Sequence, residues 1–569
     1  MLRPWIFLAL LTLGSRSFGF GWNPDLDARE HFPDDVGFVA VQLVSNVEID
    51  WLNFRGWTRL GVERIDGKSK SYTLPVRHEG LSSGQIFVGA LPAGEYRMTE
   101  FWGRVMQVGE ESEYKVSVPE SLGKFRVEAG RFSDAGALVF HFLPDSERKR
   151  VWLQWQTTGV MVRVPALPPL HPWFGAAFPR LAEVPAAEHA LEPIPESGFD
   201  ATGIAATKLE LPPALRDAAI TGRPRRLADG QLALPGQLGQ LWLRKGDAHW
   251  TSIDTPYSTE INDVLAIDGS LLIVGDRGLL ARRSADGAEW VDEKRMPANY
   301  VLHWIERLED GQIYVLASSQ TRAMLLRVSV TDLSWQELAS FGREEGFEPA
   351  DLRPDGIFVS LNEYRQLTSS PLPTRLNVLG SDHGGIRLAI GAKRWRFRFE
   401  GGQVEAMDSG QPLITAFQQP NGYLFGLSGK QEDAVYSLDG GSSWLKVQRP
   451  QRTHIGGQLS EICPPYVVDK NRVMLVGPKL TRDSRKRIKA SSQPYLLEST
   501  KPKDRFSWKA LRVMPATCYE LLSGISTDQA LFLRCRNQAI LRSADQGEHW
   551  HIDRHPSAGD QPIVNQKTL

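Results

Sequence analysis

Residues 437–444 read Ser437-Leu-Asp439-Gly-Gly441-Ser-Ser-Trp444, and this stretch decides the fold. Residues 543–550 repeat it as Ser-Ala-Asp-Gln-Gly-Glu-His-Trp, so both stretches follow S-x-D-x-G-x-x-W between apolar, strand-like runs. The pattern predicts a hairpin turn. The Asp side chain accepts hydrogen bonds from backbone N–H groups, the Gly supplies a positive φ, and the Trp ring packs beside the next strand.

A third copy at residues 284–290 is one residue shorter. The residues that we assign to the three turns are Ser284, Asp286, Trp290, Ser437, Asp439, Gly441, Trp444, Ser543, Asp545, Gly547 and Trp550. Three similar turns ended by Trp indicate a repeated unit.

Tryptophans recur through the second half of the chain, at Trp250, Trp290, Trp335, Trp395, Trp444, Trp508 and Trp550. The steps between them run from 40 to 64 residues, and a four-stranded propeller blade takes about 40–50 residues. Seven markers predict a seven-bladed propeller with two enlarged blades. Trp395 has no S-x-D turn before it, so a six-bladed propeller is the alternative.

The turns resemble Asp boxes, the bacterial neuraminidase repeat of sialidase-like and photosystem-assembly-type β-propellers, over roughly residues 216–569. The resemblance implies that an Asp box occupies the turn between the third and fourth strands of a blade, and that ligands bind on the opposite face. The Asp-box residues would then be structural. Calcium binding or catalysis by Asp286, Asp439 and Asp545 is the alternative. Asp boxes occur in hydrolases, receptors and assembly factors alike, so the resemblance implies no single activity.

Composition places few limits on the partner but agrees with an all-β fold. Lys and Arg number 66 against 67 Asp and Glu, so no net charge favours nucleic acid or an anionic membrane as the main partner. The 51 Gly, 36 Pro and 17 Trp in the chain indicate many turns and short strands.

Residues 1–19 have the pattern of a signal peptide. Arg3 precedes the apolar run Trp5–Leu13, and small residues follow at 17–19. A buried N-terminal strand is the alternative. The run is too short to span a bilayer, and no later stretch is long and apolar enough for a membrane helix. We therefore expect a periplasmic or secreted protein.

The rest of the chain divides into three parts. Alternating strands and Gly turns over residues 20–145 predict a small β-sandwich, in which Leu91-Pro-Ala-Gly-Glu-Tyr96 resembles a corner of transthyretin-like sandwiches. Residues 146–215 are rich in Pro, which predicts a linker with one short helix near Ala182–Leu191. Residues 216–569 form the predicted propeller.

Three cysteines occur in the chain. Cys518 and Cys535 lie on two strands joined by a polar turn, which would place them opposite each other in a hairpin. A disulfide between them and a pair of unpaired core thiols are both open. Cys463 is expected to be a small core residue.

Four basic residues fall in loops between the second and third strands of the predicted blades: Arg277, Arg322, Lys430 and Arg536. Together they would surround one mouth of the propeller and present donors to a carboxylate, a phosphate or an acidic protein surface. Solvated loop charge is the alternative. A separate segment, Lys479–Lys489, holds six basic residues in eleven. It is expected to be a solvated loop, with docking on an acidic partner or on lipid headgroups as the alternative.

Motifs for catalysis are missing. The chain has no R-I-P element of a sialidase, no H-E-x-x-H, no C-x-x-C, no G-x-S-x-G and no P-loop. The twelve histidines are scattered, so we expect no metal or cofactor. We therefore favour an exported, non-enzymatic binding or assembly protein whose propeller recognises a protein or glycan. A glycoside hydrolase or a carbohydrate-binding protein is the rival hypothesis.

Overall fold

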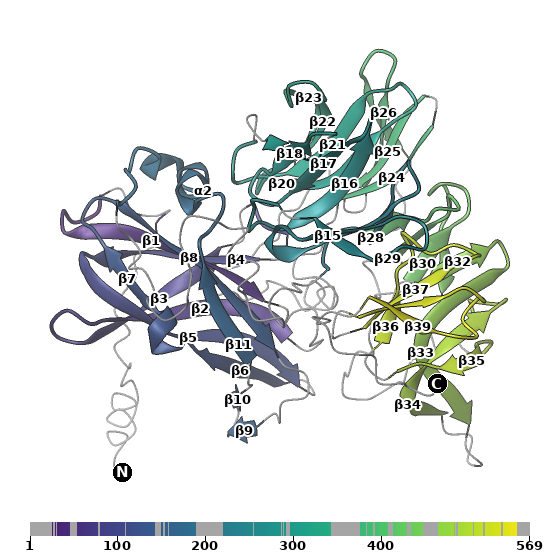
Figure 1. The fold of residues 1–569 in the computed structure, drawn as a ribbon, viewed down its shortest axis with the longest axis horizontal. Coiled ribbons are helices and arrows are strands. Elements are labelled where there is room, and N and C mark those ends of the chain that lie inside the picture. The colour runs from purple at the N-terminus through teal and green to yellow at the C-terminus, as the bar shows by residue number, and fades with distance from the viewer. Residues whose placement is uncertain are drawn as a thin grey trace, which may run out of the picture.

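The structure is a computed structural model. It describes residues 31–45, 54–142, 149–188, 220–342, 376–428, 434–447, 465–482, 488–515 and 518–554, with short gaps inside these ranges, and a few isolated positions. The predicted signal peptide and Cys463 lie outside the described residues. The fold is nearly all β, with an N-terminal sandwich and a seven-bladed propeller (Figure 1). Among the described helices, none combines the length and apolar character that crossing a bilayer requires.

The sandwich is one long sheet folded into two layers. Its strands are β1 (Val36–Ser45), β2 (Phe54–Arg64), β3 (Lys70–Arg77), β4 (Gln85–Pro92), β5 (Gly94–Gln107), β6 (Glu110–Ser117), β7 (Lys124–Val127), β8 (Phe132–Phe142), β9 (Lys149–Val151), β10 (Gln154–Gln156) and β11 (Gly159–Val164). The strand order is β11-β8-β1-β4-β3-β2-β5-β6-β10-β9, and β7 pairs with β5. Strand β3 pairs with β2 in one layer and with β4 in the other, so it forms the fold between them.

Strand β1 is apolar on both of its faces because each face packs against another part of the protein. Val39 and Val41 face the core between the two layers. Phe38 and Ala40 face the helix α2 (Leu170–Ala177), which contributes Trp173 to the same cluster. Side chains alternate between the two faces of a strand, and both faces of β1 are covered. A continuous apolar run is therefore required.

The predicted linker differs from the observed chain. Strands β9, β10 and β11 and helix α2 all fall between residues 149 and 177, and they extend the sandwich. The helix lies at 170–177 rather than near 182–191, of which residues 182–188 form turns and an isolated bridge and the rest are not described. Pro172 falls in the first turn of α2, where no N–H is needed. A proline-rich segment can therefore contain a helix, and the proline content of this segment led to the prediction of a linker instead.

The propeller consists of seven four-stranded antiparallel sheets, each built from four consecutive strands. Blades 1 to 4 comprise β12 (Arg225–Arg226), β13 (Leu232–Pro235), β14 (Leu241–Arg244), β15 (Thr251–Ile253), β16 (Ile261–Ile267), β17 (Ser270–Gly275), β18 (Leu280–Arg283), β19 (Trp290–Val291), β20 (Val301–Arg307), β21 (Ile313–Ser318), β22 (Ala323–Val328), β23 (Trp335–Phe341), β24 (Leu376–Asp382), β25 (Gly385–Ile390), β26 (Lys393–Arg398) and β27 (Val404–Met407). Blades 5 to 7 comprise β28 (Leu413–Gln418), β29 (Leu424–Ser428), β30 (Ala434–Ser437), β31 (Leu445–Val447), β32 (Tyr466–Asp469), β33 (Arg472–Arg482), β34 (Ile488–Ser499), β35 (Lys509–Val513), β36 (Cys518–Leu521), β37 (Leu531–Cys535), β38 (Ile540–Ser543) and β39 (His551–Arg554).

The blades form a closed ring, because each adjacent pair shares a buried apolar cluster. One of these clusters joins blade 7 to blade 1, where Leu234 and Trp250 pack with Phe532. The Trp250 indole N–H also donates to Asp553 Oδ2 at 2.7 Å, and Arg244 lies 3.3 Å from the same carboxylate. Closure therefore combines apolar burial with a buried ionic contact.

The S-x-D turns have the geometry that the sequence predicts. In the first, Ser437 Oγ accepts from the Gly441 N–H at 2.7 Å, and Asp439 Oδ1 accepts from the Ser443 N–H at 2.8 Å. Gly441 has φ 89°, a left-handed conformation that favours glycine. The Trp444 indole N–H donates to the Gly441 carbonyl at 3.1 Å, which fixes the ring against the cluster shared with blade 4.

The turn at 543–550 repeats each of these contacts. Ser543 Oγ accepts from the Gly547 N–H at 2.8 Å, Asp545 Oδ1 accepts from the His549 N–H at 2.8 Å, and Trp550 donates to the Gly547 carbonyl at 3.1 Å. The hydrogen bonds from His549 and Ser543 hold the pKa of Asp545 well below its usual range. In the shorter copy Gly287 has φ 72°, and Asp286 lies outside the described residues.

The tryptophan markers are equivalent in six blades. Each of these begins the outer strand or directly precedes it, whereas Trp395 lies within β26, the third strand of blade 4. Trp335 does begin an outer strand but is 39% exposed and is not packed in a blade interface. Spacing therefore predicted the number of blades correctly, although Trp395 does not occupy the expected position and Trp335 is more exposed than expected.

Replacing Trp250 with Phe should destabilise the propeller by about 1–3 kcal/mol, because Asp553 would lose a buried donor. Trp335→Phe is the matched control, and it should change stability by no more than about 0.5 kcal/mol. Urea denaturation followed by far-ultraviolet circular dichroism measures both. Equal shifts in the two variants would contradict the role given to ring closure.

Replacing Ser437 with Ala should cost about 1–2 kcal/mol, because the buried hydroxyl both accepts from Gly441 and donates to Asp439. Ser442→Ala in the same turn removes only an exposed hydroxyl. The same denaturation experiment should show little change for this control. A Ser437→Ala variant as stable as Ser442→Ala would mean that the side-chain network does not hold the turn.

Candidate recognition face

The loops that lie opposite the S-x-D turns form one face of the propeller, which we call the opposite face. The turns join the third and fourth strands of a blade. In an antiparallel sheet of four consecutive strands, the loop between strands two and three and the connection to the next blade both lie at the other end. Arg277 and Arg322, two of the four predicted basic residues, belong to these loops.

The sandwich docks on the opposite face at blades 1 and 2. Leu238, in the loop between β13 and β14, packs with Val44, Val139 and Val162 of the sandwich. The hydrogen bonds that cross the same boundary include Gln237 Nε2 to Ser45 O (3.0 Å), Leu167 N to Ser258 Oγ (2.7 Å), Ser258 N to Leu167 O (2.9 Å) and Asn299 Nδ2 to Ala176 O (3.1 Å). Part of the predicted recognition face therefore serves as a contact between domains.

Gly80 shows how closely the two backbones approach. Its φ is 71°, and a Cβ at this position would lie 2.4 Å from the Ala298 carbonyl oxygen in the connection from blade 2 to blade 3. Any side chain would therefore push the two domains apart.

Arg277 is not available to a ligand, contrary to the prediction. Only 1% of its surface is exposed. Its backbone N–H donates to the Gly80 carbonyl, and Nη1 donates to the Pro168 carbonyl, both at 2.7 Å. The prediction placed the residue in the correct loop. It could not anticipate that the sandwich covers this loop.

Asp276 lies beside Arg277 and joins the same contact. One carboxylate oxygen accepts from the Ser82 N–H at 2.9 Å, and the other accepts from Asn262 Nδ2 at 3.0 Å. Burial raises the pKa of Asp276 to about 6, although Ser82, Asn262 and Arg277 all favour the ionised form. Sequence reasoning missed Asp276, Asn262 and Ser82, because no motif marks a domain contact.

Of the other three predicted basic residues, the structure describes only Arg322. Arg322 lies on the opposite face of blade 3, where its guanidinium pairs with Glu337 at 3.0 Å and contacts Ser340 at 3.3 Å and Tyr300 at 3.5 Å. Its side chain is still 40% exposed. Lys430 and Arg536 lie outside the described residues. Of the four, only Arg322 is therefore placed in the solvent-accessible part of this face.

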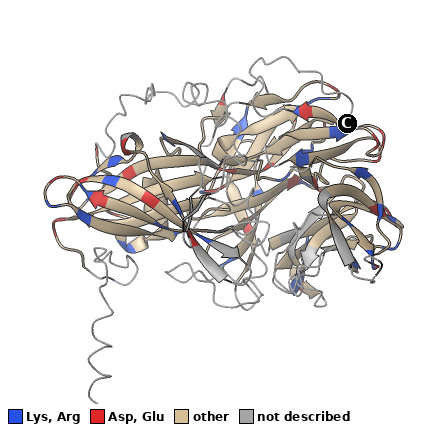
Figure 2. Cartoon of the chain, turned by 90° about the horizontal axis from the view of Figure 1, so that it is seen from below, with Lys and Arg blue, Asp and Glu red and all other residues tan. Residues whose placement is uncertain are grey.

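Ionic contacts connect the first strands of blades 1, 2 and 3. Arg225 of β12 lies 3.1 Å from Asp263 of β16 and 2.7 Å from Glu306 of β20. Burial alone would lower the pKa of Arg225, but the two carboxylates outweigh it and raise the pKa. In blade 7, Glu520 of β36 pairs with Arg534. These three carboxylates are each held by an arginine. Over the described strands of both domains, basic and acidic residues are interspersed (Figure 2).

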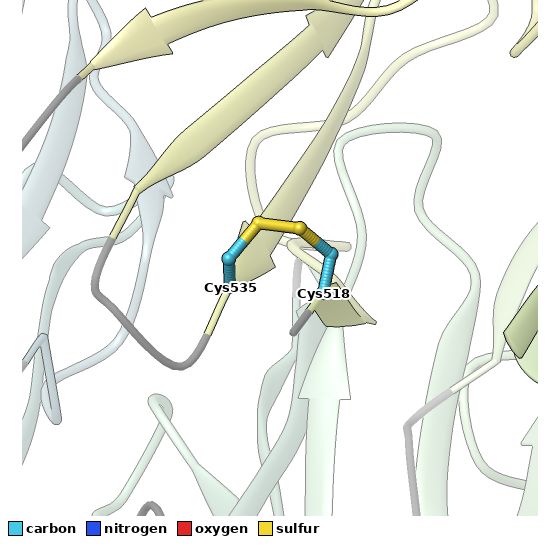
Figure 3. Close-up of a disulfide and its surroundings, with 2 residues drawn as sticks. All are labelled: Cys518 and Cys535. Carbon is cyan, nitrogen blue, oxygen red and sulfur yellow. A yellow bond between two sulfur atoms is a disulfide. The ribbon is translucent and has the colours of Figure 1, made fainter. Parts of the chain in front are cut away.

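A disulfide joins Cys518 and Cys535 at the end of blade 7 that belongs to the opposite face (Figure 3). Cys518 begins β36, Cys535 ends β37, and the two residues are direct partners in the register. The bond links the innermost strand to its neighbour immediately before the loop that contains Arg536.

One group of described residues brings metal-binding atoms together. Ligand atoms of Asp545, Glu548 and His549 lie within 4.8 Å of one another. The Asp545 oxygens are already engaged, since Oδ1 accepts from Ser543 Oγ at 2.7 Å and Oδ2 contacts His549 Nδ1 at 2.5 Å. The group therefore belongs to the hydrogen bonding of the turn.

The fold and this face define a seven-bladed β-propeller with a docked N-terminal sandwich. No protein-family model matches the chain, and no curated protein matches it. Among solved structures, YCF48 bound to D1 peptide is 16% identical at a TM-score of 0.36, and the match covers 58% of this chain and 95% of that one.

Two further matches are more distant. Virginiamycin B lyase from Staphylococcus aureus is 10% identical at a TM-score of 0.32, covering 55% of this chain and 90% of the lyase. Regucalcin from Agrobacterium tumefaciens is 11% identical at a TM-score of 0.28, covering 44% and 82%. The matches include a peptide-bound protein and an enzyme, so function is argued from this chain alone.

The domain contact should weaken as the pH rises from about 4 to about 6. Docking raises the pKa of Asp276, so the contact is strongest when the carboxyl is protonated and loses stability as the pH passes through the raised pKa. Amide hydrogen exchange of Ser82, corrected for its intrinsic pH dependence, should show protection falling by up to about tenfold per pH unit in this window. In Asp276→Asn the dependence should disappear. Protection with the same slope in both proteins would contradict this role.

Proposed function

We propose that this chain is an exported, non-enzymatic binding or assembly protein that recognises a protein partner through the part of the opposite face that the sandwich leaves uncovered. The S-x-D turns are proposed to be Asp boxes with a structural role. A glycan is the other ligand class considered from the sequence, but no described residue favours it.

The observation that carries the proposal is the docking of the sandwich. The loops of blades 1 and 2 already hold a protein surface through an apolar contact and several hydrogen bonds to main-chain groups. Main-chain recognition of this kind suits a protein ligand. Blade 3 presents the equivalent loop with Ser319, Thr321 and Arg322 at least partly exposed.

The charges near the axis favour binding over hydrolysis. A glycoside hydrolase needs two carboxyl groups that act as acid and base or nucleophile. Asp263, Glu306 and Glu520, the carboxylates described above on the innermost strands, are each paired with an arginine. A carboxylate whose oxygen is engaged by a guanidinium in this way is less available to a substrate.

Export is proposed on two grounds. Residues 1–19 have a signal-peptide pattern. The disulfide between Cys518 and Cys535 suits an oxidising compartment such as the periplasm.

Photo-crosslinking tests the recognition face. A benzophenone amino acid at Thr321 on the opposite face should yield a discrete adduct with a partner protein in cells, identified by mass spectrometry. The matched control is the same probe at Glu548, an exposed position on the face of the S-x-D turns. Adducts that form equally from both positions, or only from Glu548, would overturn the proposed face.

A further inference from the structure

The segment 479–512, which includes most of the outer strand of blade 6, is strongly basic in a chain that is otherwise close to neutral. Residues 479–512 contain eleven Lys and Arg against three Asp and Glu, a net charge of +8, whereas the whole chain carries −1. The segment includes the predicted basic loop. The structure differs from that prediction, because Lys479–Arg482 belongs to β33 and pairs with the start of β34.

The same part of blade 6 exposes large apolar side chains. Phe506 is 38% exposed, Leu511 38% and Val513 45%. Among the described residues, eight large hydrophobic side chains are exposed, and these three fall within eight residues of one another. Single exposed apolar residues are ordinary, but a cluster bordered by polar residues marks an interaction site.

Basic and apolar side chains share the outer edge of this blade. β35 is its outermost strand, and Lys509, Leu511 and Val513 are all exposed along it, on both sides of a register shift near Leu511. Lys501 and Lys503, in the loop before β35, are also exposed. The Arg482 guanidinium lies 4.2 Å from the centre of the Phe506 ring, so the end of β33 lies beside this loop. We call Lys479, Arg482, Lys501, Lys503, Phe506, Lys509, Leu511 and Val513 the blade 6 patch.

Glu498 is an acidic neighbour of the patch, because it lies opposite Lys509 in the register of β34 and β35, but its carboxylate pairs with Arg472 at 3.5 Å. Within the part of the chain that the structure describes, no ion pair joins Lys501, Lys503 or Lys509 to a carboxylate. The exposed acid among them is Asp504, and its Oδ1 accepts from the Phe506 N–H at 2.9 Å. The patch also lies apart from the docked sandwich, since β35 is at the side of the propeller away from the N-terminal domain (Figure 1).

We propose that the blade 6 patch binds the surface of an anionic lipid bilayer, with the lysines and Arg482 at the headgroups and Phe506, Leu511 and Val513 at the boundary with the acyl chains. Basic residues beside a few exposed aromatic and aliphatic side chains are the composition of interfacial membrane binding. The patch sits on the narrow edge of one blade. A stable protein interface needs roughly 800 Å² from each partner, whereas long basic side chains at a bilayer each act separately. The observations therefore favour lipid over an acidic protein.

The inference is independent of the recognition face. The patch is formed by the outer strand, the loop before it and the end of β33, all in blade 6, whereas the proposed recognition loop around Thr321 belongs to blade 3. Binding to a bilayer would place the propeller beside the membrane without a membrane-spanning segment.

Flotation with lipid vesicles tests the proposal on the full-length protein. Vesicles with 30% phosphatidylglycerol in phosphatidylcholine should carry the protein to the top of a density gradient, and vesicles of phosphatidylcholine alone should not. Binding should fall as sodium chloride rises from 50 to 300 mM, because salt screens the contact.

Three variants separate the contribution of the basic side chains from that of the apolar side chains and from the net charge of the protein. Lys501→Glu combined with Lys509→Glu should weaken binding by roughly tenfold or more, because each basic residue near an anionic surface contributes about a factor of five. Leu511→Ser combined with Val513→Ser should weaken binding and leave the salt dependence unchanged. Lys245→Glu, an exposed lysine on blade 1, is the control for net charge and should bind like the original protein.

Two outcomes would overturn the proposal. Equal binding by the Lys501→Glu, Lys509→Glu variant and by the Lys245→Glu control would place any lipid contact elsewhere. Failure to float with phosphatidylglycerol vesicles while soluble polyglutamate binds the patch would assign it to an acidic protein. Circular dichroism of each variant shows whether the propeller remains folded. Neither result depends on the crosslinking at Thr321, so the two proposals fail separately.

Discussion

The contact between blade 7 and blade 1 is the constraint on which the propeller depends. A single four-stranded blade leaves both faces exposed, and stacking buries them only if the ring closes. Here closure joins Trp250 of the first blade to Asp553 in the last strand. The two residues are far apart in the sequence, so the chain must complete all seven blades before either residue finds its partner. The apolar cluster around Leu234 and Phe532 is buried at this contact, beside the hydrogen bond and the ion pair to Asp553.

In the closed ring, the two ends of the blades make different kinds of contact. The end with the S-x-D turns is occupied by local hydrogen bonding, in which Ser437 and Asp439 satisfy the backbone of their own turn. At the other end, the loops of blades 1 and 2 contact another surface. The sandwich covers this end of blades 1 and 2, where it contacts Asp276, Arg277 and Leu238. The two domains therefore share one continuous buried boundary, and the sandwich limits which loops a partner can reach.

Charge is distributed according to the same geometry. Near the axis, Arg225 and Asp263 are buried and paired, because an isolated charge there would be costly to desolvate. At the outer edge of blade 6, Lys501 and Lys509 remain exposed and add to a local positive field. A net charge of −1 over the whole chain hides both arrangements. The position of a charge relative to the ring thus matters more than the total.

The sequence by itself determined the class of fold, because the S-x-D-x-G-x-x-W turns and the spacing of the tryptophans are local features that each blade repeats. It also predicted that Cys518 and Cys535 lie opposite each other, since hairpin register follows from the nearby turn. It did not predict helix α2, because the segment is rich in proline. It also did not predict that Trp335 is exposed. Only the tertiary structure decided that Arg277 is buried and that Arg482 lies against Phe506. Both outcomes depend on segments distant in the sequence, and local periodicity carries no information about which distant surfaces meet.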